Sequence, residues 1–151
     1  MNDTDTSIGD LKALVLQFSR ERDWEQFHHP KDLGLALASE VGELLDHFRF
    51  KDDDRIKADL GRPEVYRDVA HELADCLWAL LRLADVCGVD LASSLAEKLA
   101  LAAIKYPADQ SFGRSDKYTS YQVPVEPSLD DGPKPGGPSS LGGPDPRQYD
   151  P

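Results

Sequence analysis

The chain has 151 residues, of which 40% are hydrophobic and 30% are charged, and its formal net charge is −11. This length is typical of one domain with a sizeable core, and so acidic a surface disfavours contact with a nucleic-acid backbone or an anionic membrane. The sequence contains neither a secretory signal nor an apolar run of about 18 residues, so we expect no membrane span and a cytoplasmic protein.

Helical periodicity dominates the first two thirds of the sequence. Four helices are predicted, over about residues 8–22, 32–50, 63–87 and 91–105. Pro63 is expected to open the third helix, Gly88 to cap its end and Asp90 to cap the start of the fourth. Residues 51–62 are predicted to form a charged loop or short turn, with Asp52–Asp54 a solvated turn. Since no segment alternates with a period of two, we predict an all-α fold built as a four-helix bundle.

The connector between the first two helices contains two aromatic side chains and two histidines. Trp24 and Phe27 are interpreted as core side chains at a helix junction. The alternative is that Trp24, with His28 nearby, forms a wall on which a nucleobase stacks.

Two acidic pairs lie on the second and third predicted helices, Glu40 with Glu43 and Glu72 with Asp75. Residues three apart share a helix face, so each pair points one way. Glu40 and Glu72 also stand within apolar stripes rather than on solvated faces. We therefore expect the two helices to face each other and to bring four carboxylates together.

Four clustered carboxylates repel one another and are costly to remove from water, so they require a cation or must take up protons. Carboxylate oxygens suit a hard cation, above all Mg²⁺, which often shares its shell with substrate phosphates. We therefore predict a magnesium site and a phosphate-bearing substrate. The alternative is that these residues are ordinary surface acids of amphipathic helices.

Two further features concern the cysteines and the C-terminal segment. Cys76 and Cys87 lie on one predicted helix, about 16 Å apart, too far for a disulfide. Residues 123–151 contain eight prolines and five glycines, a composition typical of a disordered tail. We accordingly predict one domain over residues 1–122 and a disordered tail over residues 123–151.

Five stretches carry a resemblance to a known family. They are residues 21–28 (ERDWEQFH), 37–44 (LASEVGEL), 71–75 (HELAD), 105–107 (KYP) and 117–119 (KYT). They resemble the MazG-like all-α nucleoside triphosphate pyrophosphohydrolases, and within that superfamily the dCTP pyrophosphatase branch. The resemblance covers about residues 8–121.

The resemblance implies a reaction and a set of metal ligands. Glu40, Glu43, Glu72 and Asp75 would hold Mg²⁺, while water attacks the α-phosphorus of a dNTP, dCTP or a modified dCTP, releasing dNMP and pyrophosphate. Glu43 is the candidate for the group that accepts the proton of the water. Such an enzyme would clean the nucleotide pool, and the resemblance also implies a homotetramer, a dimer of dimers.

The resemblance implies substrate contacts as well. Trp24, His28 and Phe50 would line the base pocket, Phe50 standing where the branch often has Trp. The cations that could meet the β- and γ-phosphates are Lys98, Lys105, Arg114 and Lys117; the alternative for each of them is a solvated surface side chain. Ala79 and Ala102 depart from the branch, which carries an aromatic residue and Asn at those places, and Trp78, next to Ala79, is expected to pack elsewhere.

Two other functions fit parts of the pattern. A di-iron carboxylate bundle, an oxidoreductase, uses Glu-x-x-His motifs, and Glu25 and His28 have that spacing, although only once. A non-catalytic helical interaction module would use the acids merely as surface charge.

Overall fold

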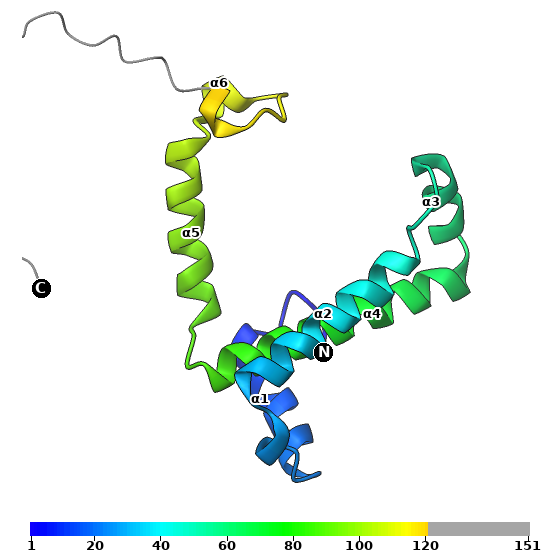
Figure 1. Ribbon diagram of the computed structural model, residues 1–151, viewed down its shortest axis with the longest axis vertical. Coiled ribbons are helices and arrows are strands. Elements are labelled where there is room, and N and C mark those ends of the chain that lie inside the picture. Colours follow the sequence, from blue (N-terminus) through cyan, green and yellow to red (C-terminus); the bar gives the residue numbers. More distant parts are fainter. Residues whose placement is uncertain (121–151) are drawn as a thin grey trace, which may run out of the picture. The chain divides into compact units, whose positions relative to one another are not determined.

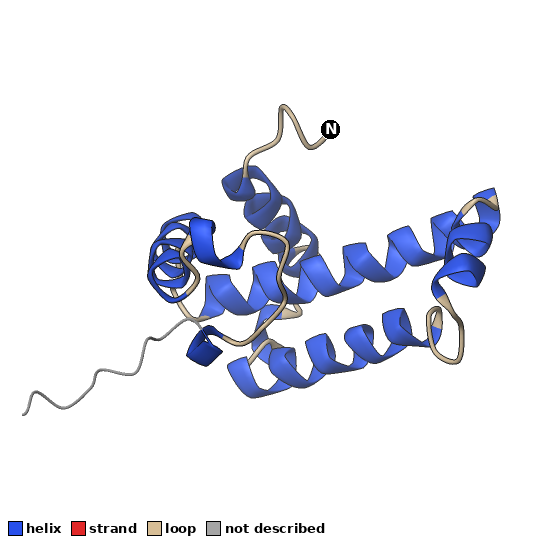
Figure 2. Cartoon of the chain, turned by 90° about the horizontal axis from the view of Figure 1, so that it is seen from above, coloured by secondary structure: helices blue, strands red, loops and turns tan. Residues whose placement is uncertain are grey.

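The computed structural model describes residues 1–120, and every regular element in this range is helical (Figure 1; Figure 2). The elements are α1 (Ile8–Arg20), α2 (Pro30–Asp46), α3 (Asp53–Leu60), α4 (Pro63–Val86), α5 (Leu91–Lys105) and α6 (Ala108–Ser111), with short 3₁₀ helices at Glu25–Phe27 and Tyr118–Ser120. The chain divides into two compact units, of which the first is Met1–Pro107. The predicted all-α fold is confirmed.

The four predicted helices correspond to α1, α2, α4 and α5, and α5 has the predicted bounds. The predicted first and second helices were too long at their C-terminal ends, because residues 47–50 are turns and α1 ends at Arg20. The predicted tail and its boundary after residue 122 lie outside the described residues. None of the helices in residues 1–120 is long and apolar enough to cross a membrane.

The prediction of a loop over residues 51–62 was wrong, since α3 occupies most of it. The side chain of Asp52 accepts a hydrogen bond from the backbone N–H of Arg55 at 2.8 Å, which is an N-cap. Asp53 and Asp54 then lie in the first turn, where negative charge is favourable to the helix dipole. The acidic run therefore begins a helix instead of forming a solvated turn.

The caps predicted around α4 and α5 are confirmed. Gly88 has φ +66°, a left-handed conformation that is favourable for glycine after a helix. Asp90 accepts a hydrogen bond from the backbone N–H of Ser93 at 2.8 Å. Pro63 lies in the first turn of α4, where its missing N–H costs nothing. Pro63 and Gly88 thus mark the bounds of the long central helix α4, and Asp90 marks the start of α5.

Helix α4 is the centre of the first unit, with α2 packed along it and α1 and α3 also in contact with it. In Figure 1, α2 and α4 run side by side. The buried apolar side chains are Leu33 of α2 and Val69, Ala79, Leu81 and Ala84 of α4. The prediction that the two acid-bearing helices face each other is confirmed.

A buried carboxylate fastens α3 to its flanking turns. Asp59 is only 6% exposed and forms ion pairs with Lys51 at 2.9 Å, Arg55 at 3.1 Å and Arg62 at 2.8 Å. The hydrogen bond from Lys51, aided by Arg55, holds the pKa of Asp59 below its usual range. These ion pairs hold α3 against Lys51, which precedes it, and against Arg62, which leads into α4.

Candidate metal centre and adjoining cavity

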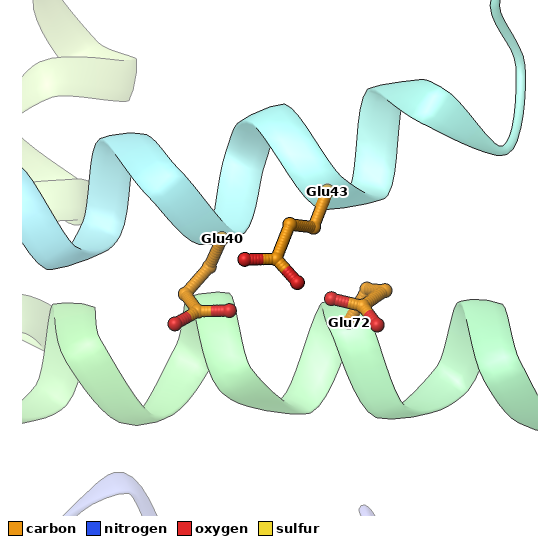
Figure 3. Close-up of side chains that lie close together, drawn as sticks. All are labelled: Glu40, Glu43 and Glu72. Atoms are coloured by element: carbon orange, nitrogen blue, oxygen red, sulfur yellow. The ribbon is translucent and has the colours of Figure 1, made fainter.

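Three glutamates meet between α2 and α4. One carboxylate oxygen from each of Glu40, Glu43 and Glu72 lies within 4.8 Å of the others. Figure 3 shows the three side chains turned toward one another, Glu40 and Glu43 from α2 and Glu72 from α4. The three-residue spacing in α2 and the packing of α2 on α4 together produce this group, which we call the glutamate cluster.

The glutamate cluster has about the dimensions of a metal shell. Oxygens on opposite sides of Mg²⁺ are about 4.2 Å apart, twice the bond length of about 2.1 Å. No ion pair within residues 1–120 involves Glu40, Glu43 or Glu72, so no protein cation neutralises the cluster there. An all-oxygen donor set of this size and charge fits a hard divalent cation.

Asp75, the fourth predicted ligand, does not belong to the group of three. Its charge nevertheless acts on Glu40, and it lines the cavity described below. The structure therefore brings together three of the four predicted ligands and places the fourth next to them.

The surroundings of Glu40 disfavour its charged form. Burial raises the pKa of Glu40, and the charges of Glu43, Asp75 and Glu72 raise it further. The pKa of the Cys76 thiol is raised by burial and by the charges of Glu40, Glu72 and Asp75, so this cysteine stays a neutral thiol. The raised pKa of Glu40 and the close approach of the three carboxylates both indicate that the cluster needs a cation or a proton.

A cavity of about 250 Å³ adjoins the cluster. Among its lining side chains are His28, Leu33, Glu40, Asp75, Trp78 and Arg82. Pockets that enclose whole small molecules usually measure about 300–1,000 Å³. The cavity is therefore large enough for part of a ligand, such as the base of a nucleotide whose phosphates extend toward the carboxylates.

Aromatic rings form one wall beside this cavity. Trp78 lies edge-on to Phe18, with ring centroids 5.7 Å apart, and 6.3 Å from Trp24, which is itself 6.3 Å from the ring of His28. Phe27 lines the cavity and is 62% exposed, and Trp24 is 37% exposed, so the interpretation of both as core side chains was wrong. The expectation that Trp78 packs elsewhere was wrong, because its side chain lines the cavity.

Of the predicted substrate residues, His28 lines this cavity, whereas Trp24 and the others do not. Phe50 is 96% exposed and has φ +60°, with the guanidinium of Arg49 5.2 Å from its ring. Lys98 and Lys105 are exposed on α5. Lys117 lies in the second unit, as does Arg114.

The sequence interpretation missed Arg82, which is 5% exposed and lines the cavity. A signal for it exists, because Arg82 is the single charge in the apolar run Leu80–Ala84. A charge at such a position is buried only when it is paired. Spacing along α4 offers Asp85 as one partner, whereas His28 and Glu25 could not be identified from it.

Adding Mg²⁺ near pH 7.5 is expected to raise the melting temperature of the chain, by about 2–8 °C. Because the pKa of Glu40 is raised in the folded state, the folded chain binds its proton more tightly than the unfolded chain. The metal-free protein should therefore lose stability as pH rises from the ordinary carboxylate value through the raised pKa of Glu40, and a bound cation offsets this loss. Thermal unfolding followed by circular dichroism, with Mg²⁺ or with chelator, measures the difference. Equal melting temperatures at neutral pH would contradict the expectation, and near pH 4 the difference should vanish.

Curated relatives match most of the chain, although no protein-family model matches it. The dCTP pyrophosphatase 1 proteins of Rattus norvegicus and Homo sapiens are each 39% identical over 113 residues, 75% of this chain and 66% of theirs. The protein of the same name from Bos taurus is 38% identical over 116 residues, 77% of this chain and 69% of its own. The chain thus spans about two thirds of the length of the curated relatives that it matches.

A solved structure supports the same assignment. A pyrophosphatase from Archaeoglobus fulgidus superimposes with a TM-score of 0.63 at 29% identity, covering 71% of this chain and 98% of the archaeal chain. The helical fold is that of the MazG-like all-α superfamily. Within that superfamily, the chain belongs to the dCTP pyrophosphatase family.

Proposed function

We propose that the chain is a Mg²⁺-dependent nucleoside triphosphate pyrophosphohydrolase that cleaves a dNTP, dCTP or a modified dCTP, to dNMP and pyrophosphate. The observation that carries this proposal is the glutamate cluster, with no cationic partner in residues 1–120, beside a cavity of the size of a nucleobase. The family membership supports the same reaction, since curated relatives are named dCTP pyrophosphatase 1.

Glu40, Glu43 and Glu72 would hold the cation, with Asp75 as a fourth ligand after a side-chain adjustment. When bound, the cation would neutralise the triphosphate oxygens and favour attack by water. The oxygen of the water forms a bond to the α-phosphorus, and the bond from that phosphorus to the oxygen bridging to the β-phosphorus breaks. Glu43, the exposed member of the cluster, is the proposed acceptor of the water's proton.

The substrate is proposed to place its base in the cavity and its phosphates at the carboxylates. His28 and Trp78 line that cavity, and the Trp24 ring lies next to Trp78, with ring centroids 6.3 Å apart. Lys98, Lys105 and Lys117 remain proposed phosphate contacts. Ala79 also lines the cavity. Because its side chain is small, it leaves room for a substituent on the base.

A di-iron centre is disfavoured by the same geometry. His28 Nδ1 accepts a hydrogen bond from Arg82, and Glu25 lies 3.6 Å from the same guanidinium. Neither residue belongs to the glutamate cluster. The Glu-x-x-His spacing is therefore accounted for by an arginine contact.

We also propose a homo-oligomer, a dimer of dimers. Helix α5 contains no buried residue, and Leu95, Leu99 and Ile104 are 57%, 60% and 77% exposed. Leu95 and Leu99 lie one turn apart on the same helix face, and neighbouring exposed apolar side chains are typical of a surface that another chain covers. Light scattering coupled to size exclusion gives the mass, and a monomer at micromolar concentration would contradict this part.

The test of the function is a panel of dCTP, modified dCTPs and the other dNTPs, incubated with Mg²⁺ and scored for pyrophosphate against orthophosphate. The proposal expects pyrophosphate and dNMP in equal amounts, with cytosine nucleotides preferred. Release of orthophosphate, or no turnover of any dNTP, would contradict it. Iron and visible absorbance in the purified protein would favour the di-iron alternative.

A further inference from the structure

Arg82 is a buried guanidinium in the middle of the central helix. It is 5% exposed, and its neighbours along the chain are apolar. Arginine is almost never buried to this degree unless it is paired, because desolvating its charge is costly. The partners of Arg82 therefore indicate why the residue is tolerated there.

Three groups from two segments surround the guanidinium. Its Nε donates to His28 Nδ1 at 3.0 Å, and its Nη1 donates to a carboxylate oxygen of Asp85. Its Nη2 lies 3.6 Å from a carboxylate oxygen of Glu25, a longer ion pair. Asp85 is one turn away on α4, whereas Glu25 and His28 belong to the connector between α1 and α2.

The bond to His28 fixes the position of the histidine proton. A guanidinium stays protonated in proteins and has only donors, so the His28 Nδ1 that faces it must carry a lone pair. Burial and the charge of Arg82 lower the pKa of His28, although Glu25 opposes this. The ring is therefore neutral at physiological pH, with its one hydrogen on Nε2.

The other acids around this pair do not change that assignment. Asp32 and Glu40 of α2 and Asp75 of α4 line the same cavity, but the hydrogen bond to Nδ1 is already made by Arg82. Nε2–H is the remaining polar group of His28, and His28 lines the cavity. What the histidine can offer a ligand there is a donor.

We propose that Arg82 is a positioning residue for substrate recognition: it holds His28 in the Nε2–H tautomer, so that the cavity presents a fixed hydrogen-bond donor to an acceptor atom of the bound base. This inference rests on the proposed function and deepens it. In a cytosine ring the acceptors are the carbonyl O2 and the ring N3. A histidine free to change tautomer would present a donor only part of the time.

The opposing view is that Arg82 only ties the connector to α4. A purely structural tie would change stability when removed, but not the tautomer of His28 nor the discrimination between bases. Two readouts therefore separate the views, the ¹⁵N spectrum of the histidine rings and the affinity for base analogues.

The first experiment is long-range ¹H–¹⁵N NMR on the full chain, with the His28 signals identified by their loss in His28→Gln. In the wild type, the proposal expects Nδ1 to show the shift of an unprotonated nitrogen and Nε2 that of a protonated one. In Arg82→Met, the two nitrogens should move toward a mixture of tautomers. A protonated Nδ1 in the wild type would overturn the proposal, even if Arg82→Met failed to fold.

The second experiment measures affinity for dCTP with a nitrogen in place of the α,β-bridging oxygen, through the fluorescence of Trp24 and Trp78. Its 3-deaza analogue lacks the N3 acceptor, and its 2-thio analogue replaces the O2 acceptor by sulfur, a much weaker one. The wild type should bind one of them about three- to tenfold more weakly, as expected for one lost hydrogen bond. That preference should be lost in Arg82→Met, retained in part in Arg82→Lys and unchanged in the exposed control Arg67→Met.

The outcomes distinguish this inference from the proposed function. If the wild type neither binds nor hydrolyses any nucleotide, the proposed function fails. If it hydrolyses dCTP normally while Arg82→Met keeps the base preference and the His28 spectrum of the wild type, only the role of Arg82 fails. In the supporting case, KM for dCTP rises in Arg82→Met by about the same factor as the affinity falls, and kcat changes less.

Discussion

Glu40→Gln is expected to lower the Mg²⁺-dependent hydrolysis of dCTP by at least about 100-fold. Even residues that only orient metal ligands typically cost 10- to 100-fold when replaced, and Glu40 is proposed to be a ligand itself. The variant keeps the size of the side chain but removes one charge from the glutamate cluster. Steady-state kinetics over a range of Mg²⁺ concentrations measures the loss, and excess metal should restore little of it.

The same substitution should stabilise the metal-free fold. Glu43, Asp75 and Glu72 raise the pKa of Glu40 because they disfavour its charge, and a neutral amide removes that repulsion. Glu40→Gln should therefore melt at or above the temperature of the wild type in chelator and gain nothing from Mg²⁺. The control is Glu64→Gln, which removes an exposed charge at the start of α4. If both variants retained normal turnover, the cluster would not be the catalytic centre.

Leu81→Ala is expected to lower the free energy of unfolding by about 2–5 kcal/mol, the usual cost of truncating a buried leucine. Leu81 is 2% exposed on α4, the helix against which α1, α2 and α3 pack. Since small domains are stable by about 5–15 kcal/mol, this loss is a large fraction of the total. Urea unfolding followed by circular dichroism gives the value.

Leu73→Ala serves as the matched control for Leu81→Ala. Leu73 lies on the same helix but is 53% exposed, so its truncation should cost clearly less. Equal costs for the two variants would contradict the burial assigned to α4. Both titrations are carried out at one protein concentration, because association of the chains would add to the apparent stability.

The positions of the clustered glutamates follow from helix periodicity. The three-residue spacing of Glu40 and Glu43 and their place in an apolar stripe predict inward-facing carboxylates, and the structure brings both to Glu72. The start and end of α5 were also predictable, because Asp90 and the Lys105–Pro107 segment are strong local signals. Periodicity is sufficient here because both acidic pairs stand in apolar stripes, and the apolar stripes of neighbouring helices pack against each other.

Features that depend on distant partners could not be predicted in this way. Arg82 donates to His28, which is 54 residues away in the chain, so the pairing depends on how the connector folds back onto α4. Phe50 has a positive φ that no propensity for phenylalanine predicts. Helix α3 was missed for another reason, because its acidic first turn has the same composition as a solvated loop.

The central claim is that Glu40, Glu43 and Glu72 bind a divalent cation at which a dNTP is hydrolysed. The most direct measurement is a crystal structure with Mn²⁺, located by its anomalous scattering, and with dCTP whose α,β-bridging oxygen is replaced by nitrogen. We expect an anomalous peak within about 2.2 Å of oxygens from these glutamates, and we expect the ion at that peak to contact the triphosphate. Bound nucleotide with no peak at the cluster, and the three carboxylates turned into solvent, would contradict it.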